Sequence, residues 1–435
     1  LTLIKRPPLG RGNEVKTDRV NRCVLVDGEP FFPYGIVICG RSLSAIPKEG
    51  YNTALRWWWG YATQGNPDAD IIEAAKNEPL LQGGQQYGFK VIDRLMNTRK
   101  IHPTFSYTSE NFVTSVEDWL KNDVAKVLPV IQHNPALLAV MGFDEPGHRQ
   151  VFPGPRDAMD ITVEVIKSFR EHGGYHPNFT NYNHFFPKEL KYTRYDDVLS
   201  VYVYWHPEKR RGLAIRDIVE TAQAFAAGQH KPLWLMPMTE NHGSGQYNPM
   251  TPREQFANTY IMMVNGAAGI YYFWWPNYHR DTVECFQQLS KEVATLAPAL
   301  MRRAPKQEIT LAGDARKQSA VDFALRVMPD GALVIAFVNV ADYAVDFTCE
   351  MPWLSEDATL QSLVPRGEAA LADGVLTEML EPLATRAYRI EGHHISAPDT
   401  MHAVTISEEH PPEAAAHHAG PVTSCRVRAS RSAES

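Results

Sequence analysis

Two glutamates in this sequence, Glu145 and Glu240, stand where a pair of carboxyl groups could do chemistry together. Glu145 lies two residues after the apolar run 137–143, and Glu240 lies two residues after the run 233–238. Two carboxyl groups that face each other can cleave a glycosidic bond, because one protonates the departing oxygen while the other attacks the anomeric carbon. We therefore take Glu145 as the candidate acid/base and Glu240 as the candidate nucleophile.

The other expected strand ends are rich in aromatic and polar residues, the types that line a sugar-binding slot. Aromatic rings stack on the apolar faces of sugars. The histidines are expected to form a hydrogen-bonding wall, because the carboxyl groups already supply both proton-transfer roles. The tryptophans at 57–59 cannot all face one site, since alternate strand residues point in opposite directions. The candidate substrate-binding residues are Arg56, Trp57, Trp58, Tyr107, Asp144, Tyr204, His206, His242, Trp274 and Trp275.

The elements that must position these residues alternate along most of the chain. From about Val24 to about Pro298, short apolar runs alternate with longer amphipathic stretches, which indicates repeated βα units and a parallel sheet. Eight such strands close most economically as a (β/α)8 TIM barrel, whose active sites lie at the C-terminal strand ends. The expected strands are 34–39, 53–57, 101–106, 137–143, 178–182, 198–204, 233–238 and 269–273. The expected helices include 113–131, 156–170, 215–227, 252–264 and 282–296.

The segments that flank this repeat have different patterns. Asp27-Gly28 between apolar runs predicts a hairpin, which we interpret as a barrel floor. After about residue 305 the segments become short and alternating, which predicts a small antiparallel β-sandwich. The end of the chain is rich in Ala, Pro, Ser and His without periodicity, which predicts a disordered tail. The expected division is an N-terminal extension at 1–23, a catalytic barrel at 24–303, a β-sandwich at 304–392 and a tail at 393–435.

Composition excludes several classes of function. The 435 residues are 44% hydrophobic and 21% charged, as in a globular protein. A net charge of −7 does not indicate the positively charged surface that binds nucleic acid. No apolar stretch approaches the roughly 18–20 residues that cross a bilayer. We therefore expect a neutral or weakly charged ligand, with no nucleic-acid or membrane partner.

The cysteines and histidines predict neither a metal nor a cofactor. Five cysteines lie far apart without CxxC spacing, which favours buried free thiols over a zinc site or a dense disulfide framework. The tail histidines lack an ordered frame that could hold a metal. No charged-then-apolar targeting pattern is present, so a signal peptide is expected to be absent or already removed. The compartment stays open, with a secreted or periplasmic location favoured, and the oligomeric state is not readable.

These features together resemble the clan A retaining glycoside hydrolases over residues 24–298. The segment Tyr-Asn-Thr-Ala-Leu-Arg56 is similar to the clan's second strand, which ends in an arginine that contacts the nucleophile. The sandwich is similar to the C-terminal domain that many members append. The resemblance implies a TIM barrel and a two-glutamate mechanism that retains anomeric configuration. Its other matching positions are Asp144-Glu145-Pro146, similar to the clan's Asn-Glu-Pro, Tyr204 on strand six, and Trp274 or Trp275 on strand eight.

One position departs from the clan's pattern and leaves alternatives open. Asp144 stands where the clan usually has an asparagine that contacts the sugar 2-hydroxyl. Our interpretation is hydrolysis of a β-linked glycoside or polysaccharide by double displacement, without metal or organic cofactor. In one alternative, a substrate-assisted N-acetyl-hexosaminidase, Asp144 orients the substrate's acetamido nucleophile, Glu145 is the acid, and Glu240 only binds. In another, the chain is a noncatalytic carbohydrate-binding protein on a hydrolase scaffold. Sugar, linkage, and exo or endo action are not readable.

Overall fold

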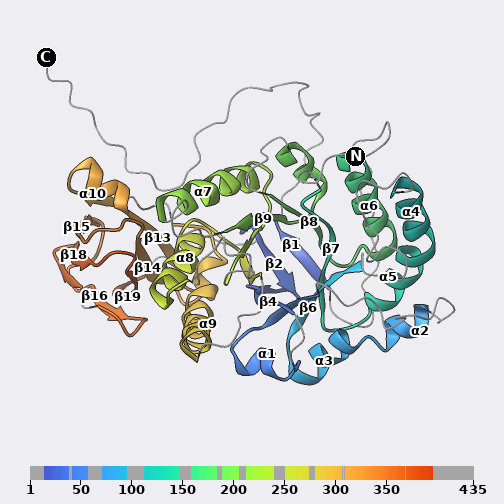
Figure 1. Cartoon of the computed structure of the whole chain (residues 1–435). Coiled ribbons are helices and arrows are strands. Elements are labelled where there is room, and N and C mark those ends of the chain that lie inside the picture. The colour runs from blue at the N-terminus through green and yellow to red at the C-terminus, as the bar shows by residue number, and fades with distance from the viewer. Residues whose placement is uncertain are drawn as a thin grey trace, which may run out of the picture. The chain divides into compact units, whose positions relative to one another are not determined.

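The structure is a computed structural model that divides between Met301 and Arg302 into two compact units. The first unit combines helices and strands and the second is almost entirely β (Figure 1). The described residues are 14–38, 42–56, 71–95, 112–146, 158–183, 189–204, 212–239, 250–273, 280–305, 307, 309–367 and 369–394.

Eight parallel strands of the first unit form a closed barrel, which confirms the predicted TIM-barrel fold. Each strand pairs in parallel with the next along the chain, and the last pairs with the first through Tyr271 and Gly35. Most of the strand residues are buried, as expected for a parallel sheet covered by helices. The strands are β4 (Tyr34–Ile38), β5 (Thr53–Arg56), β6 (Lys90–Arg94), β7 (Leu137–Asp144), β8 (Asn178–Tyr182), β9 (Leu199–Val203), β10 (Leu233–Pro237) and β11 (Gly269–Tyr272).

The third barrel strand is not where the sequence predicted it. The prediction placed it at 101–106, but β6 pairs with β5 through Ile92 and Leu55 and continues into β7. The prediction was wrong because β6 has only two apolar residues, Val91 and Ile92, between charged ones, whereas β4, β7, β10 and β11 contain longer apolar runs. Residues 101–106 and Tyr107 lie outside the described residues, and Tyr107 does not end the third strand.

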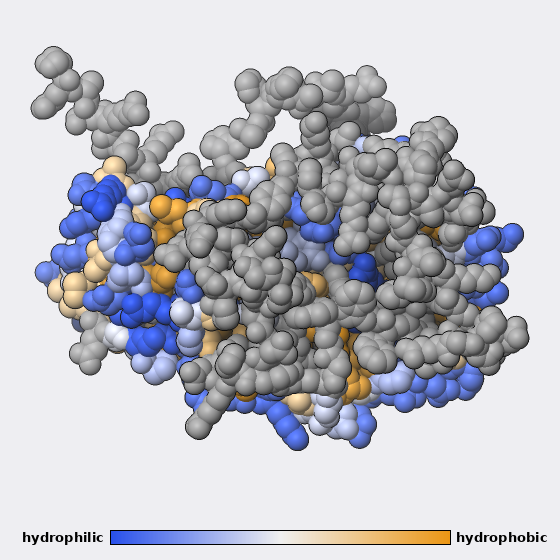
Figure 2. All heavy atoms as spheres, in the orientation of Figure 1, coloured by the Kyte–Doolittle hydropathy of each residue, from blue (hydrophilic) through white to orange (hydrophobic). Residues whose placement is uncertain are grey.

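Helices surround the barrel strands and follow the predicted amphipathic stretches (Figure 1). Thr251 and Glu254 form a reciprocal capping box at the start of α8, which fixes where that helix begins. On the face shown in Figure 2, hydrophilic residues follow the edge of the unit where α2 and α3 lie. The helical elements are α1 (Ala45–Lys48), α2 (Ile71–Lys76), α3 (Pro79–Tyr87), α4 (Phe112–Trp119), η2 (Leu120–Val124), α5 (Ala125–Ile131), α6 (Ala158–Gly173), η3 (Glu189–Tyr195), α7 (Gly212–Gly228), α8 (Pro252–Val264) and α9 (Arg280–Leu300).

A small antiparallel sheet packs against the end at which the barrel strands begin. It consists of β1 (Val15–Asp18), β2 (Cys23–Val26) and β3 (Glu29–Phe31). Asp27 and Gly28 have φ angles of 52° and 90°, as a two-residue type I′ hairpin requires, so the predicted hairpin is confirmed. Val15 and Val24 join the apolar cluster that fills the barrel interior. The sheet therefore acts as the floor of the barrel.

The second unit contains two four-stranded antiparallel sheets over a shared core. One sheet has the order β12-β15-β18-β17 and the other β13-β14-β19-β16. Sequence reasoning missed β17 and β18, although Asp373-Gly374 between them is a hairpin signal with φ angles of 51° and 74°. The elements are β12 (Thr310–Ala312), α10 (Ala315–Ala320), β13 (Val321–Val327), β14 (Ala332–Asn339), β15 (Val345–Glu350), β16 (Thr359–Ser362), β17 (Ala370–Ala372), β18 (Val375–Leu380) and β19 (Thr385–His394).

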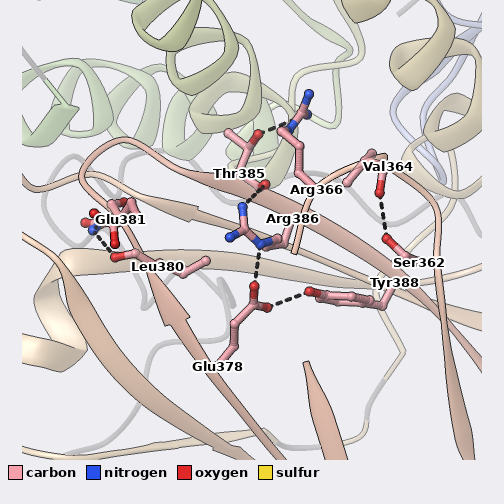
Figure 3. Close-up of polar contacts among 10 residues, drawn as sticks. Ser362, Val364, Arg366, Glu378, Leu380, Glu381, Thr385, Arg386 and Tyr388 are labelled. Carbon is pink, nitrogen blue, oxygen red and sulfur yellow. Dashed lines mark hydrogen bonds and ion pairs between the residues drawn. The ribbon is translucent and has the colours of Figure 1, made fainter. Parts of the chain in front are cut away.

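A polar cluster joins these two sheets (Figure 3). Glu378 of β18 accepts hydrogen bonds from the Arg386 guanidinium and, at 2.6 Å, from the Tyr388 hydroxyl, both of β19. Strand β19 also runs past the expected start of the tail at 393, because His394 pairs with Ala332 of β14, and the Ser355 amide donates to Nδ1 of His393. The remaining part of the predicted tail, 395–435, lies outside the described residues.

Candidate active site

The candidate site begins with an irregularity near the C-terminal end of β7. Met141 pairs with Phe179 of β8, but the next pair joins Asp144 to Asn181, so β7 contains one extra residue. Such a bulge re-aims the side chains that follow it. Here it turns Asp144 to the same side as Met141, whose side chain belongs to the interior cluster of the barrel. Without the extra residue, Phe143 would occupy that side.

Asp144 is held inside the barrel by neutral donors. Its side chain is only 4% exposed. The Tyr202 hydroxyl donates to Oδ1 of Asp144 at 2.8 Å, and Nδ2 of Asn181 donates to the same oxygen at 3.2 Å. Burial, and then the nearby Asp144 carboxylate, raise the pKa of Tyr202 well above its ordinary value. The phenol therefore keeps its proton and remains a donor to Asp144.

The network continues across the barrel to two further strands. Oδ1 of Asn181 accepts a hydrogen bond from the Ser200 hydroxyl of β9 at 2.8 Å. Ser200 in turn bonds the Tyr271 hydroxyl of β11, and burial raises the pKa of Tyr271. Buried networks whose members are satisfied rigidify a core. Asp144 is thus fixed from β8 and β9 rather than by its own strand alone.

Glu145 leaves the strand in a backbone conformation that non-glycine residues seldom adopt. Its φ angle is +48°, in the left-handed region. Its amide donates to the Asn181 carbonyl at 2.8 Å, and its Oε1 accepts from Nδ2 of Asn183 at 2.7 Å. A left-handed non-glycine residue costs about 1–3 kcal/mol and persists only where its surroundings hold it, commonly at functional sites. The half-buried Glu145 carboxyl therefore has a fixed direction.

Tyr204 lies just beyond β9, two residues after Tyr202. The two rings are 4.6 Å apart between centroids. Tyr204 also stacks on Phe273, with centroids 6.3 Å apart and an interplanar angle of 25°. The predicted strand-six tyrosine is therefore next to the Asp144 network, with its ring packed on the aromatic residue that follows β11.

Arg56 is not brought to this cluster by any described contact. Leu55 belongs to the interior cluster, so the next residue of β5 points to the outer side of the barrel. There Nη2 of Arg56 lies 2.5 Å from Oε2 of Glu78 and 3.4 Å from Oδ2 of Asp93. Glu78 also caps α3 by accepting from the Leu81 amide at 2.8 Å. Burial raises the pKa of Glu78, and the Arg56 cation acts in the opposite direction. Arg56 therefore joins β5, β6 and α3, so its predicted contact with a nucleophile gains no support.

The remaining predicted site residues cannot be placed. Thr239 ends the described segment after β10, and its amide donates to the Phe273 carbonyl at 3.0 Å. The chain therefore still follows the barrel wall one residue before the candidate nucleophile. The predicted residues that lie outside the described residues are Trp57, Trp58, Tyr107, His206, Glu240, His242, Trp274 and Trp275.

Sequence reasoning missed three residues that the structure brings to the site: Asn181, Asn183 and Tyr202. A signal for the asparagines was present, because residues 181–183 read Asn-Tyr-Asn at the end of a strand. Two polar residues at that spacing share one face of an extended chain. The ring of Tyr202 belongs to the interior cluster, as the ring of a residue that only fills the barrel would. Its hydroxyl nevertheless binds Asp144.

The described residues contain neither a cluster of three or more potential metal ligands nor a helix long and apolar enough to span a membrane. Within the same ranges Cys23, Cys285 and Cys349 are buried free thiols, as predicted. Burial raises the pKa of both Cys23 and Cys349 to about 12, which makes these thiols unreactive near neutral pH.

Comparison with known proteins shows which solved structures share this fold. No protein-family model matches the sequence. No curated protein sequence matches it either. Among solved structures, Gan42B, a GH42 beta-galactosidase from G. stearothermophilus, aligns with a TM-score of 0.54 and 10% identity over 82% of this chain and 98% of that chain. AmyP in complex with maltose aligns with a TM-score of 0.52 and 11% identity over 82% and 90%.

An alpha-amylase from Geobacillus thermoleovorans, solved with acarbose, aligns with a TM-score of 0.50 and 10% identity over 80% of this chain and 90% of that chain. The chain shares its fold with glycoside hydrolases. The resemblance that the sequence suggested is thereby confirmed at the level of the fold. The order of the barrel strands also makes β7 strand four and β10 strand seven, the strands that precede Glu145 and Glu240.

Proposed function

We propose that this protein is a retaining glycoside hydrolase in which Glu145 is the acid/base and Glu240 the nucleophile. The observation that carries the proposal is the geometry of Glu145. It leaves the C-terminal end of a barrel strand at a φ of +48°, and its carboxylate is held at 2.7 Å by Asn183. Active sites of TIM-barrel enzymes lie at that end of the strands. A strained, anchored, half-buried carboxyl group at that end supports a catalytic role.

In the proposed reaction the two glutamates work in two steps. Glu145 gives its proton to the departing glycosidic oxygen while Glu240 attacks the anomeric carbon and forms a glycosyl-enzyme. The ionised Glu145 then takes a proton from water, which attacks the same carbon and releases Glu240. In enzymes of this type the carboxyl groups lie about 5–5.5 Å apart, too close to admit a water between them and the sugar. We expect no metal or organic cofactor in this scheme.

The substrate class is proposed from the aromatic residues and from the fold. Tyr204, the tryptophans at 57–58 and the tryptophans at 274–275 follow three different barrel strands, where rings could stack on a sugar. The matched solved structures include a beta-galactosidase and an alpha-amylase. These matches support a carbohydrate substrate but not its linkage, for which we keep the β-linked glycosidic bond of the sequence-based interpretation.

A second candidate is favoured by the position of Asp144. The bulge in β7 turns this carboxylate inward, directly beside Glu145 in the chain. In a substrate-assisted hexosaminidase such a carboxylate would stabilise the positive charge that develops when the substrate's acetamido group attacks. Against it, Oδ1 of Asp144 already accepts from Tyr202 and Asn181, which gives the residue a role within the barrel wall.

Two single variants on one aryl glycoside separate the candidates. With two catalytic glutamates, Asp144→Asn keeps an acceptor oxygen for its barrel donors, so turnover survives within roughly tenfold, about 1.4 kcal/mol of barrier. Glu240→Gln then loses nearly all turnover. With an acetamido nucleophile the pattern reverses, because asparagine cannot stabilise the developing cation. An inactive Asp144→Asn beside an active Glu240→Gln would reject our assignment.

The stereochemistry gives an independent test. Proton NMR of the first-formed product should show the same anomeric configuration as the substrate, and an inverted product would reject double displacement. Binding of a saccharide by calorimetry, with no release of reducing sugar over long incubation, would instead identify a noncatalytic carbohydrate-binding protein.

A further inference from the structure

We propose that Asn183 is a positioning residue: by donating to Oε1 of Glu145 it makes Oε2 the oxygen that carries the proton which the departing group receives. The inference rests on the proposed function, because it takes Glu145 as the acid/base. It concerns a residue that neither the strand-end pattern nor the resemblance pointed to.

The contact itself is short and comes from a placed donor. Nδ2 of Asn183 donates to Oε1 of Glu145 at 2.7 Å, which is the length of a charge-assisted hydrogen bond. Asn183 is buried, with 8% of its surface exposed. The amide is therefore already largely withdrawn from water in the folded chain, and its direction does not depend on a substrate.

The backbone of β8 explains why the donor is in this place. Asn181 and Asn183 are two residues apart on an extended segment, so their side chains share a face. The side chain of Asn181 holds Asp144, and its carbonyl accepts the Glu145 amide at 2.8 Å. Residues 181 and 183 thus hold Glu145 at two points, the peptide and the carboxyl. These contacts help keep Glu145 at its left-handed φ.

A carboxylic acid offers its proton from only one of its two oxygens. An amide N–H needs a lone pair on Oε1, so the acidic proton is carried by Oε2 when Asn183 donates to Oε1. In the first step this proton passes from Oε2 to the departing oxygen, and the bond electrons of the broken C–O bond stay with that oxygen. In the second step Oε2 accepts a proton from water. Asn183 remains a donor throughout and gives up no proton.

Other groups near Glu145 also affect its titration. Asp144 precedes it on β7, and from β9 the Tyr202 phenol senses its charge, which contributes to the raised pKa of that phenol. Tyr204 lies beside Tyr202. On the other side of β7, Arg94 ends β6 and pairs in register with Met141. None of these residues is altered in the variants below, so a change in titration can be assigned to position 183.

The test uses the full chain and measures kcat/KM of Asn183→Ala on two aryl glycosides of the sugar that the wild type cleaves. With a phenyl leaving group, which needs protonation, kcat/KM should fall about tenfold, because general-acid catalysis depends on orientation. With a 2,4-dinitrophenyl leaving group, which needs little protonation, it should fall less than about twofold. The basic limb of the pH profile should move up by about half to one pH unit, because the donor that favours ionised Glu145 is lost.

Asn183→Asp is the second variant, since it keeps the shape of the side chain. When ionised it cannot donate and places a like charge beside Glu145, so the basic limb should move further than in Asn183→Ala. Asn178→Ala is the matched control. Asn178 starts the same strand and donates to Oδ2 of Asp197 at 2.7 Å, but at the opposite end of the barrel. It should lower stability without changing the pH profile or the leaving-group dependence.

An equal loss on both leaving groups with an unmoved basic limb, alongside an intact requirement for Glu145, would overturn the role of Asn183 while leaving the proposed function standing. A readout without turnover is the titration of the Glu145 carboxyl, followed by carbon-13 NMR as the difference from Glu145→Gln. Its midpoint should rise by about half to one pH unit in Asn183→Ala. An unchanged midpoint overturns the proposal. A wild type that hydrolyses no glycoside rejects both the proposed function and this role of Asn183.

Discussion

The barrel contains two pairs of adjacent acidic residues at opposite ends of its strands. Asp144 and Glu145 lie where β7 ends, whereas Asp196 and Asp197 lie just before β9 begins. Both pairs contact β8, the strand between β7 and β9. Each pair accepts one hydrogen bond from a phenol; the floor pair accepts one from an asparagine side chain and the mouth pair accepts two. Tyrosine hydroxyls and asparagine amides therefore bind acidic residues at both ends of the barrel.

The pair at the floor has the features of a structural site. The Tyr182 hydroxyl donates to Asp196 at 2.7 Å, and Nδ2 of Asn178 donates to Asp197 at 2.7 Å. Asp197 also accepts the Asn178 amide and forms an ion pair with Arg170 at 2.7 Å. These bonds join α6, β8 and the segment before β9. This is the end of a TIM barrel whose residues serve stability rather than chemistry.

The pair at the mouth differs in backbone and in exposure. Glu145 has the left-handed φ of +48°, and its carboxyl group is only half-buried. Asp144 beneath it receives its described hydrogen bonds from a phenol and an amide, which orient the carboxylate without neutralising it. Adjacent acids held by a tyrosine and an asparagine therefore do not by themselves identify a catalytic site. The end of the strand on which they lie, and the strain of the backbone, distinguish the two.

Glu145→Gln should produce the largest effect in this comparison. Its amide oxygen can still accept from Asn183, so the fold is expected to be preserved, but no proton can be transferred. Loss of a general acid lowers the rate by about 10²–10⁴-fold on substrates with poor leaving groups. Steady-state kinetics on a phenyl glycoside, with circular dichroism to verify folding, measures this loss. Near-wild-type turnover would assign the chemistry to another residue.

The two phenols provide the next largest effect. Tyr202→Phe removes the donor to Asp144, and Tyr182→Phe removes the donor to Asp196. Loss of a hydrogen bond to a charged group costs about 1.5–3 kcal/mol of unfolding free energy, and we expect a cost of this order at Asp144. Only Tyr202→Phe should also lower kcat, because only its partner adjoins Glu145. Urea denaturation and initial rates for both variants decide this, and an equal loss of kcat in the two would remove the distinction between the pairs.

Asp197→Ala should cost stability alone. It removes the acceptor for the backbone and side-chain amides of Asn178, a residue only 2% exposed. Leaving a buried amide unsatisfied costs about 1–3 kcal/mol. The ion pair with Arg170 adds little, because the Arg170 side chain is 42% exposed. Denaturation midpoints measure the cost, with Asp342→Ala as a surface control. A change in kcat per folded molecule would show that the floor communicates with the mouth.

The sequence predicted the barrel because buried parallel strands are apolar runs and because helices repeat at a different period. It failed at β6, whose charged residues have partners that are distant in the sequence: Lys90 donates to the Pro135 carbonyl at 2.7 Å, and Asp93 pairs with Arg56. Seven of the eight predicted barrel strands overlap strands of the structure. Elements that depend on hydrophobic pattern could therefore be predicted, and those that depend on tertiary pairing could not.

At the site, the sequence predicted which residues follow the strands but not where they point. A one-residue bulge reverses the direction of Asp144, and nothing in the local pattern of β7 specifies that bulge. Arg56 was expected in the site because it ends β5. Alternate residues of a strand point to opposite faces, however, and Arg56 is on the outer face, toward α3. Hydrogen-bond partners such as Asn183 come from a neighbouring strand. Their roles became visible only with the register between strands.

Asp196→Asn should have the smallest effect of these variants on the free energy of unfolding at low pH. The effect should grow as the pH rises. Burial raises the pKa of Asp196 to about 8, partly opposed by the Tyr182 hydrogen bond and the Lys231 charge. In the unfolded chain this carboxyl group loses its proton near pH 4. Between these values the native state holds a proton that the unfolded state has released, so the free energy of unfolding falls as the pH rises. Burial lowers the pKa of Lys231 to about 8, and its contribution of opposite sign appears only above that pH.

Urea denaturation at pH 5, 6 and 7 therefore isolates Asp196. At pH 5 the variant should match the wild type most closely, since asparagine resembles a protonated carboxyl group that still accepts from Tyr182. By pH 7 it should be the more stable of the two, because it does not have to take up a proton in order to fold. A variant whose stability follows the wild-type pH dependence in parallel would mean that Asp196 is ionised in the folded barrel, and that the Tyr182 hydrogen bond and the Lys231 charge together outweigh the cost of its burial.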